Sequence, residues 1–232
     1  MNSKTQYTRA KPEPRGLALR RILVPLDFSG KSRQALRFAI PLAQRYGARI
    51  SLVHAVEHPV YPEAFGSLAI DVVTPGQAAQ AILAEMAARM LPAGLAGETI
   101  VCYGSASGNI CASADDLNAD LIVISTHGRT GLSRGLLGST AERVVRYAHC
   151  SVLTVRRRAE AGSLDGLKEA GDRPPWQRIL VPLDFSLSSL RALGVAVDLA
   201  EDSGARLLML HVAESALGVT GPDGAALAVP SP

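Results

Sequence analysis

One nine-residue segment occurs twice in this chain. Residues 21–29 read RILVPLDFS, and residues 178–186 repeat them without a change. Two later features recur at the same offset: Gly47-Ala-Arg as Gly204-Ala-Arg, and His54 as His211. An identical segment followed by matched landmarks indicates an internal repeat. With 232 residues, the chain can hold one α/β domain of about 150 residues and part of a second.

Apolar runs alternate with helical patterns through the first copy. We predict strands at 21–27, 48–56, 98–103, 120–125 and 151–155, and helices at 31–46, 77–91, 107–118 and from about 137. Pro41 should kink or locally loosen the first helix, and residues 57–76 are predicted to form a long loop. Strands that alternate with helices favour an α/β fold with a doubly wound, open, parallel five-stranded sheet.

The apolar stripes predict which side of each helix is buried. Leu36, Ala39, Ile40 and Ala43 mark the first helix. The stripe of the second comprises Ala79, Ile82, Leu83, Met86 and Met90, and that of the last comprises Leu137, Ala141, Val144, Val145 and Ala148.

The second copy contains a strand, a helix and a strand, and it has no counterpart of the glycine-rich stretch described below. We predict a disordered basic tail at 1–20, a complete domain at 21–156, a linker at 157–176 and a truncated repeat at 177–232. A lone β-α-β unit would leave strand edges uncovered. The second copy is therefore expected to be marginally ordered, completed by another surface, or part of a truncated product.

Charge and cysteine content narrow the class of protein. Residues 1–21 hold six Lys or Arg against one Glu, so the other 211 residues carry a net charge of −2, which disfavours nucleic-acid binding by the folded part. The chain has no apolar run long enough to span a membrane and no signal-peptide pattern. Its three cysteines lack metal-ligand spacing and resemble small buried residues. We expect a cytoplasmic location without membrane association.

A glycine-rich stretch joins the predicted fourth strand to the last helix. Residues 124–141 read ISTHGRTGLSRGLLGSTA and contain four glycines. Glycine allows positive φ and a close approach of the backbone to a ligand. Because the stretch ends at a helix N-terminus, it could bind an anion. The alternative is a flexible surface loop with a Ser or Thr cap.

This stretch and the repeated segment resemble the universal stress protein family, in its tandem form. ATP-binding members carry G-x2-G-x9-G-[S/T] after the fourth strand, and the matching positions are Ser125, Gly128, Gly138 and Ser139. The spacing fits, although a serine replaces the first glycine. The resemblance implies a Rossmann-like fold, similar to the adenine nucleotide α-hydrolases.

The resemblance also implies a set of nucleotide-binding residues. The segment that frames adenine and ribose would be Pro25, Leu26, Asp27, Phe28 and Ser29, with Ala55 and Ile124 as adenine walls. The phosphate contacts would be Ser125, His127, Gly128, Arg129, Gly138, Ser139 and Thr140. Alternatives remain: Asp27 or Ser29 could cap the next helix, His127 and Arg129 could be surface residues, and His54 and His211 could be core or rim histidines.

The implied function is that of an ATP-binding regulatory protein in the stress response. No lysine stands in the loop, so it is not a P-loop, and no pattern suggests an efficient catalytic base. We expect ATP with Mg²⁺ or Mn²⁺ carried on the triphosphate, slow hydrolysis at most, and a homodimer formed through Ser151–Val155. The alternatives are an interaction module without nucleotide and a nucleotide α-hydrolase enzyme, for which residues 26–29 match poorly.

Overall fold

The computed structural model describes residues 18–57, 74–126, 138–156 and 176–213. These residues fall into two compact units. The larger unit lies within Leu17–Pro175, and the described part of the smaller unit begins at Trp176. Most of the predicted tail, the 57–76 loop and the linker lie outside the described residues.

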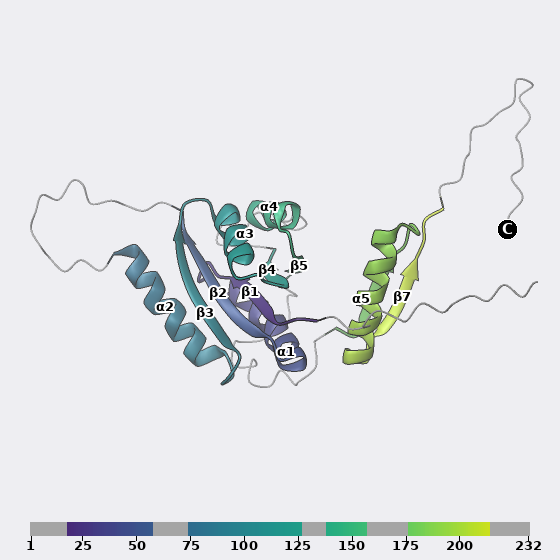
Figure 1. The fold of residues 1–232 in the computed structure, drawn as a ribbon, viewed down its shortest axis with the longest axis horizontal. Helices are drawn as coiled ribbons and strands as arrows, with labels where there is room; N and C mark the ends of the chain where they lie inside the picture. Colours follow the sequence, from purple (N-terminus) through teal and green to yellow (C-terminus); the bar gives the residue numbers. More distant parts are fainter. Residues whose placement is uncertain (1–17, 58–73, 127–137, 157–175, 214–232) are drawn as a thin grey trace, which may run out of the picture. The chain divides into compact units, whose positions relative to one another are not determined.

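The larger unit contains one five-stranded sheet (Figure 1). Its strands are β1 (Arg21–Pro25), β2 (Arg49–Val56), β3 (Ala96–Tyr103), β4 (Leu121–Ser125) and β5 (Ser151–Val155). They are all parallel, in the order β3-β2-β1-β4-β5. This arrangement confirms the predicted doubly wound α/β fold.

Strand β1 lies at the centre of the sheet and is buried on both faces. Ile22 is 1% exposed and Leu23 is 0% exposed, which explains why the strand is an uninterrupted apolar run rather than an alternating one. Ile22 pairs with Ile50 of β2 on one side and with Leu121 of β4 on the other. Pro25 is the last residue of the strand, where its missing N–H interrupts the hydrogen bonds of the sheet least.

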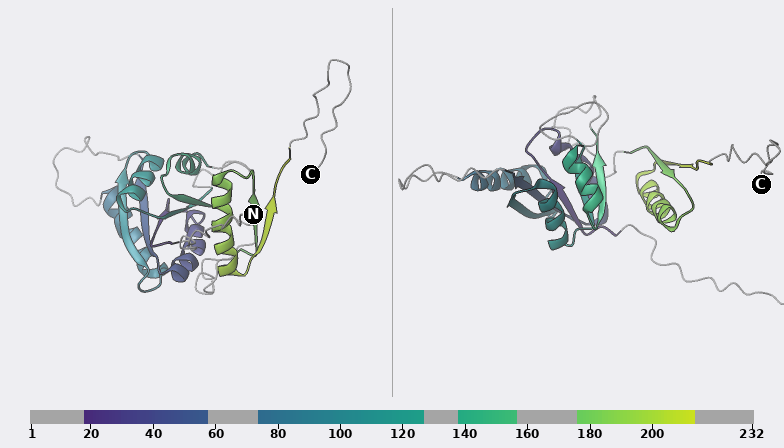
Figure 2. Two further views of the ribbon diagram at one scale, coloured as in Figure 1. Left: turned by 45° about the vertical axis from the view of Figure 1, so that its right-hand side comes forward. Right: turned by 90° about the horizontal axis from the view of Figure 1, so that it is seen from above.

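In the described part of this unit, four α-helices pack on the sheet: α1 (Leu36–Tyr46), α2 (Pro75–Met90), α3 (Ala106–Asp116) and α4 (Ser139–Tyr147). Helices α1 and α2 cover one face, while α3 and α4 lie together on the other (Figures 1 and 2). A 3₁₀ turn, Ser32–Ala35, precedes α1, and Pro41 is accommodated within the helix. Gly47 ends α1 with φ of 67°, in the left-handed region that glycine adopts readily.

Some of the predicted buried stripes are confirmed, and others are too wide. The α1 stripe of Leu36, Ala39, Ile40 and Ala43 is buried throughout. On α2, however, Ile82 is 42% exposed, and on α4 Val145 is 48% exposed. Helix α2 packs on β2 and β3 at one side of the sheet, so only a narrow strip around Ala79 and Leu83 is fully covered. Leu137 lies outside the described residues.

The smaller unit repeats the β-α-β start of the larger one. It consists of β6 (Arg178–Pro182), α5 (Leu187–Ser203) and β7 (Arg206–Leu210), and its strands pair in parallel. Phe28 has φ of 62° and Phe185, at the same repeat position, has φ of 63°, values unusual for a residue other than glycine. The repeated sequence therefore adopts the same turn twice. Within the described residues, no helix is long and apolar enough to cross a membrane.

The two copies of one leucine provide a test of what burial contributes. Leu23 is 0% exposed, whereas Leu180 at the same repeat position is 60% exposed among the described residues. We predict that Leu23→Ala lowers the free energy of unfolding by about 2–5 kcal/mol. Leu180→Ala should change it by no more than about 0.5 kcal/mol. Urea denaturation followed by circular dichroism measures both, and equal losses would contradict the burial assignment.

Candidate functional site

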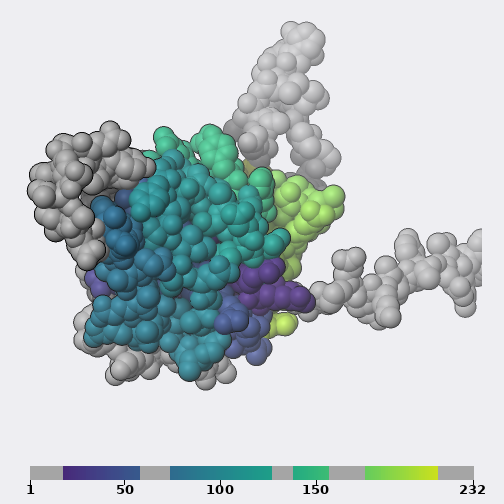
Figure 3. Space-filling view, turned by 60° about the vertical axis from the view of Figure 1, so that its left-hand side comes forward, coloured from purple at the N-terminus to yellow at the C-terminus, as the bar shows by residue number. Residues whose placement is uncertain are grey.

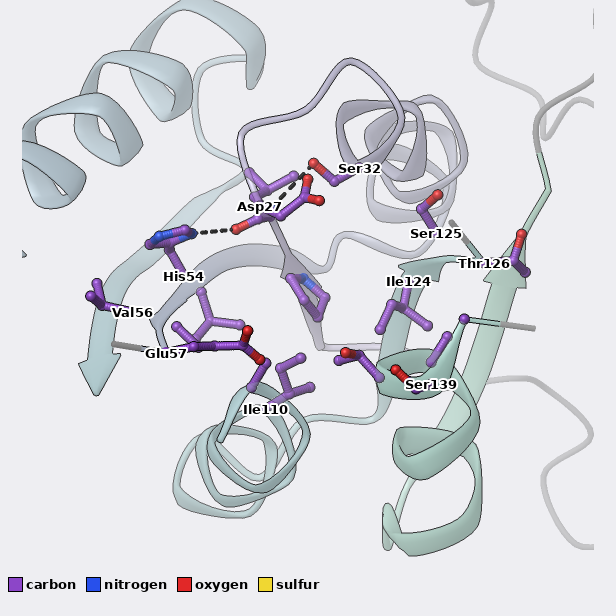
Figure 4. A pocket seen from close by; sticks show the side chains of 18 residues that line it. Asp27, Ser32, His54, Val56, Glu57, Ile110, Ile124, Ser125, Thr126 and Ser139 are labelled. Carbon is purple, nitrogen blue, oxygen red and sulfur yellow. Dashed lines mark hydrogen bonds between the residues drawn. The ribbon is translucent and has the colours of Figure 1, made fainter. Parts of the chain in front are cut away.

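A cavity of about 500 Å³ lies at the carboxyl ends of β1 and β4. The strand order reverses between these two strands, so their connections leave in opposite directions and open a crevice between them. Figure 4 shows side chains from both strand ends, from the end of β2, and from α3 and α4 around this space. Its volume is within the usual range for small-molecule sites.

The turn after β1 fixes Asp27 at the wall of the cavity. The Asp27 carboxylate accepts the Ser29 N–H at 2.9 Å, and the Ser29 hydroxyl accepts the Ser32 N–H at 3.1 Å. The Asp27 N–H in turn donates to the Ser32 hydroxyl at 3.3 Å. Both residues thus support the turn itself, and Asp27 also lines the cavity. The alternative that one of them caps the next helix is wrong, because neither the 3₁₀ turn nor α1 has a side-chain cap.

His54 forms a second support for the same turn. Its Nδ1 lies 2.7 Å from the Leu26 carbonyl oxygen, and because a carbonyl can only accept, Nδ1 must carry the proton. Its ring stacks on Phe28, with centroids 4.0 Å apart and planes 24° apart. His54 lines the cavity as a rim histidine, whereas Phe28 is turned toward the histidine ring.

The other wall is formed where the chain enters α4. The Thr126 N–H donates to the Val155 carbonyl at 2.9 Å, and the Gly138 N–H donates to the Thr126 carbonyl at 2.8 Å. A Cβ atom on Gly138 would lie 2.8 Å from that same oxygen. Gly138 has φ of −60°, so glycine is needed here for the close approach and not for a positive φ.

Helix α4 begins without a side-chain cap. Its N-cap is Gly138, so the expected alternative of a Ser or Thr cap is wrong. Helices α1 and α3 also begin without a side-chain cap, and Ala106 at the start of α3 lines the cavity too. Thr74 and Gln77 form a capping box on α2, and Ser186 caps α5. The first N–H groups of a helix have no partner within the helix. At α4 these groups are at the cavity wall, because Gly138, Ser139 and Thr140 all line the cavity.

The structure brings together most of the residues predicted to bind a nucleotide. The lining includes Pro25, Leu26, Asp27, Ala55, Ile124, Ser125, Gly138, Ser139 and Thr140. Phe28 and Ser29 lie in the turn behind Asp27 and are not among the lining residues. His127, Gly128 and Arg129 lie outside the described residues.

Sequence reasoning missed several lining residues. They are Ser32, Val53, Val56, Glu57, Ala106, Ile110, Thr126 and Ala141, whereas His54 was expected as a core or rim histidine. Thr126 and Glu57 directly follow the ends of β4 and β2, and Ala106 begins α3, so the strand-end rule could have found them. The others line the cavity through packing, which has no sequence signature of its own.

The chemistry of the described lining is limited. Its charged groups are the carboxylates of Asp27 and Glu57. The described residues contain no group of three side chains that could hold a metal ion. Cys102, Cys111 and Cys150 are free and lie outside the lining, and desolvation by burial raises the pKa of all three thiols. Those thiols therefore stay protonated at neutral pH and serve as small packing residues.

A family model with the description "Universal stress protein family" matches residues 18–156 and 175–229. The chain belongs to the universal stress protein family. It is 34% identical over 143 residues to a universal stress protein of Methanocaldococcus jannaschii, covering 60% of this chain and 82% of that protein. It is 33% identical over 140 residues to a Coxiella burnetii homologue of universal stress protein A, covering 58% and 94%.

A solved structure supports the fold. The crystal structure of a universal stress protein from Archaeoglobus fulgidus matches with a TM-score of 0.60 and 23% identity. The match covers 84% of this chain and 67% of that one. At this identity the likeness concerns the fold alone.

Proposed function

We propose that this universal stress protein binds an adenine nucleotide, with ATP as the ligand, and acts as a regulatory protein in the stress response. The observation that carries the proposal is the polarity of the cavity. One end has the uncapped start of α4 and the hydroxyls of Ser139 and Thr140. At the ends of β1 and β2 and on α3, the lining combines apolar residues with the imidazole of His54 and the carboxylates of Asp27 and Glu57.

The α4 end suits the phosphates. Unpartnered N–H groups and the positive end of the helix dipole attract an anion. Ser125 and Thr126 add hydroxyls from the end of β4. Arg129, predicted to pair with phosphate, would supply positive charge. With two carboxylates in the lining, a triphosphate would enter with Mg²⁺ or Mn²⁺ bound to its own oxygens.

The β1 and β2 end suits the nucleoside. Leu26, Val53, Ala55 and Ile110 offer apolar surface of the kind that an aromatic base covers. Asp27 also lines the cavity, where its carboxylate can accept a ribose hydroxyl. The His54 ring is held by the Leu26 carbonyl, but it forms no hydrogen bond to a described hydroxyl or thiol that it could activate, so we propose binding, with slow hydrolysis at most. The free thiols fit the reducing cytoplasm.

Calorimetry with MgATP tests the proposal, and Ser139→Asp is the sharpest variant. Ser139 is exposed, and an acidic residue in a first helical turn stabilises the helix by about 0.3–1 kcal/mol. The same negative charge repels phosphate, so we predict at least a tenfold weaker affinity without loss of stability. Gly138 is a poorer choice, because any side chain there must displace Thr126.

Gln77→Glu is the matched control. It adds one negative charge to the first turn of α2, outside the cavity, and a carboxylate can still accept the Thr74 N–H. Affinity should stay at the wild-type value. If the wild-type protein gives no heat and no melting shift up to millimolar MgATP, the proposal is wrong and the alternative, an interaction module without nucleotide, takes its place.

We also propose that two copies associate through β5, one of the two edge strands of the sheet. The Val155 carbonyl faces β4, where it accepts the Thr126 N–H, so the main-chain groups of Thr154 face the open edge. Val145 and Tyr147 on the adjacent α4 are 48% and 63% exposed.

Thr154→Pro removes an N–H from this open edge while sparing the bonds to β4. We predict that light scattering finds dimers for the wild-type protein and monomers for the variant, with circular dichroism unchanged. A variant that stays dimeric would place the interface elsewhere.

A further inference from the structure

We propose that Glu57 selects the base, by accepting a hydrogen bond from the exocyclic amino group of adenine. This inference rests on the proposed nucleotide site and assigns its specificity to one side chain. Glu57 is the residue that directly follows β2, and it lines the cavity. It is not part of the glycine motif or of the repeated segment.

The position of Glu57 places it at the nucleoside end. Figure 4 shows its side chain extending from the end of β2 toward Ile110 of α3. Val56 precedes it in the chain, and Val56, Glu57 and Ile110 all line the cavity. A carboxylate at the edge of an apolar wall can meet the polar edge of a base whose ring lies on that wall.

Charge orients the nucleotide in the same direction. Phosphates are repelled by Glu57 and attracted by the uncapped start of α4, which borders the cavity from other elements. Figure 4 shows Ser139 and Glu57 approaching the cavity from different sides. The triphosphate therefore points toward α4, and the base points toward the end of β2.

The two carboxylates in the lining differ in their hydrogen bonds. Asp27 accepts the Ser29 N–H within its own turn. Glu57 makes no hydrogen bond or ion pair with any other residue that the structure describes. A carboxylate accepts hydrogen bonds and cannot donate them, so its natural partner in the cavity is an N–H group of the ligand. Adenine offers such a group on its exocyclic nitrogen.

The test compares ATP with purine riboside triphosphate, which lacks only the exocyclic amino group. We predict that wild-type protein binds ATP about tenfold more tightly, the scale of a hydrogen bond to a charged group that is partly exposed. In Glu57→Ala the ratio of the two dissociation constants should fall to about one. The ratio is the readout, because removal of a negative charge strengthens the binding of both triphosphates.

Glu98→Ala is the control. Glu98 lies on β3, outside the cavity lining, and its loss changes the net charge by the same amount. This variant should keep the tenfold preference. If Glu57→Ala also keeps it, or if the wild-type protein binds both triphosphates equally, the role of Glu57 is refuted while nucleotide binding stands. If neither triphosphate binds to the wild-type protein, the proposed function itself fails and this inference fails with it.

Discussion

Burial of β1 on both faces is the constraint on which the larger unit depends. The strand forms ladders with β2 and β4, and helices cover it from either side, so its residues must be apolar without alternation. The connection that follows β1 leads to β2, on one side of it in the sheet. The connection that follows β4 leads to β5, in the opposite direction. The crevice at this reversal is the cavity, so the arrangement that buries the strand also creates the candidate site.

The smaller unit separates what the local sequence decides from what packing decides. The repeated nine residues form the same strand and the same turn, in which His211 Nδ1 lies 2.7 Å from the Leu183 carbonyl, as His54 does from Leu26. In this exposed turn, hydrogen bonds with Ser186 and then Ser189 lower the pKa of Asp184 to about 2. Local sequence is thus enough for the turn. A binding cavity also needs the β4 end and α4, which the larger unit supplies.

Much of the fold follows from patterns that a reader can find in the sequence. Apolar runs place all five strands, and strand-end reasoning places Asp27, Ser125 and Ser139 around one crevice. The periodicity of α2 and α4 overstates burial at Ile82 and Val145, because apolar spacing does not reveal how much of a helix its neighbours cover. The uncapped start of α4 and the Gly138–Thr126 contact could not be predicted, since both are features of tertiary packing that leave no local pattern in the sequence.

The proposed nucleotide would lie with its phosphates at the start of α4 and its base against the apolar residues of the cavity. A crystal structure of the full chain grown with MgATP tests that claim most directly. We predict the triphosphate within hydrogen-bonding distance of the N–H groups at the start of α4, with the base against Val53 and Ile110. A nucleotide bound in the reverse orientation, or outside this cavity, would contradict the account.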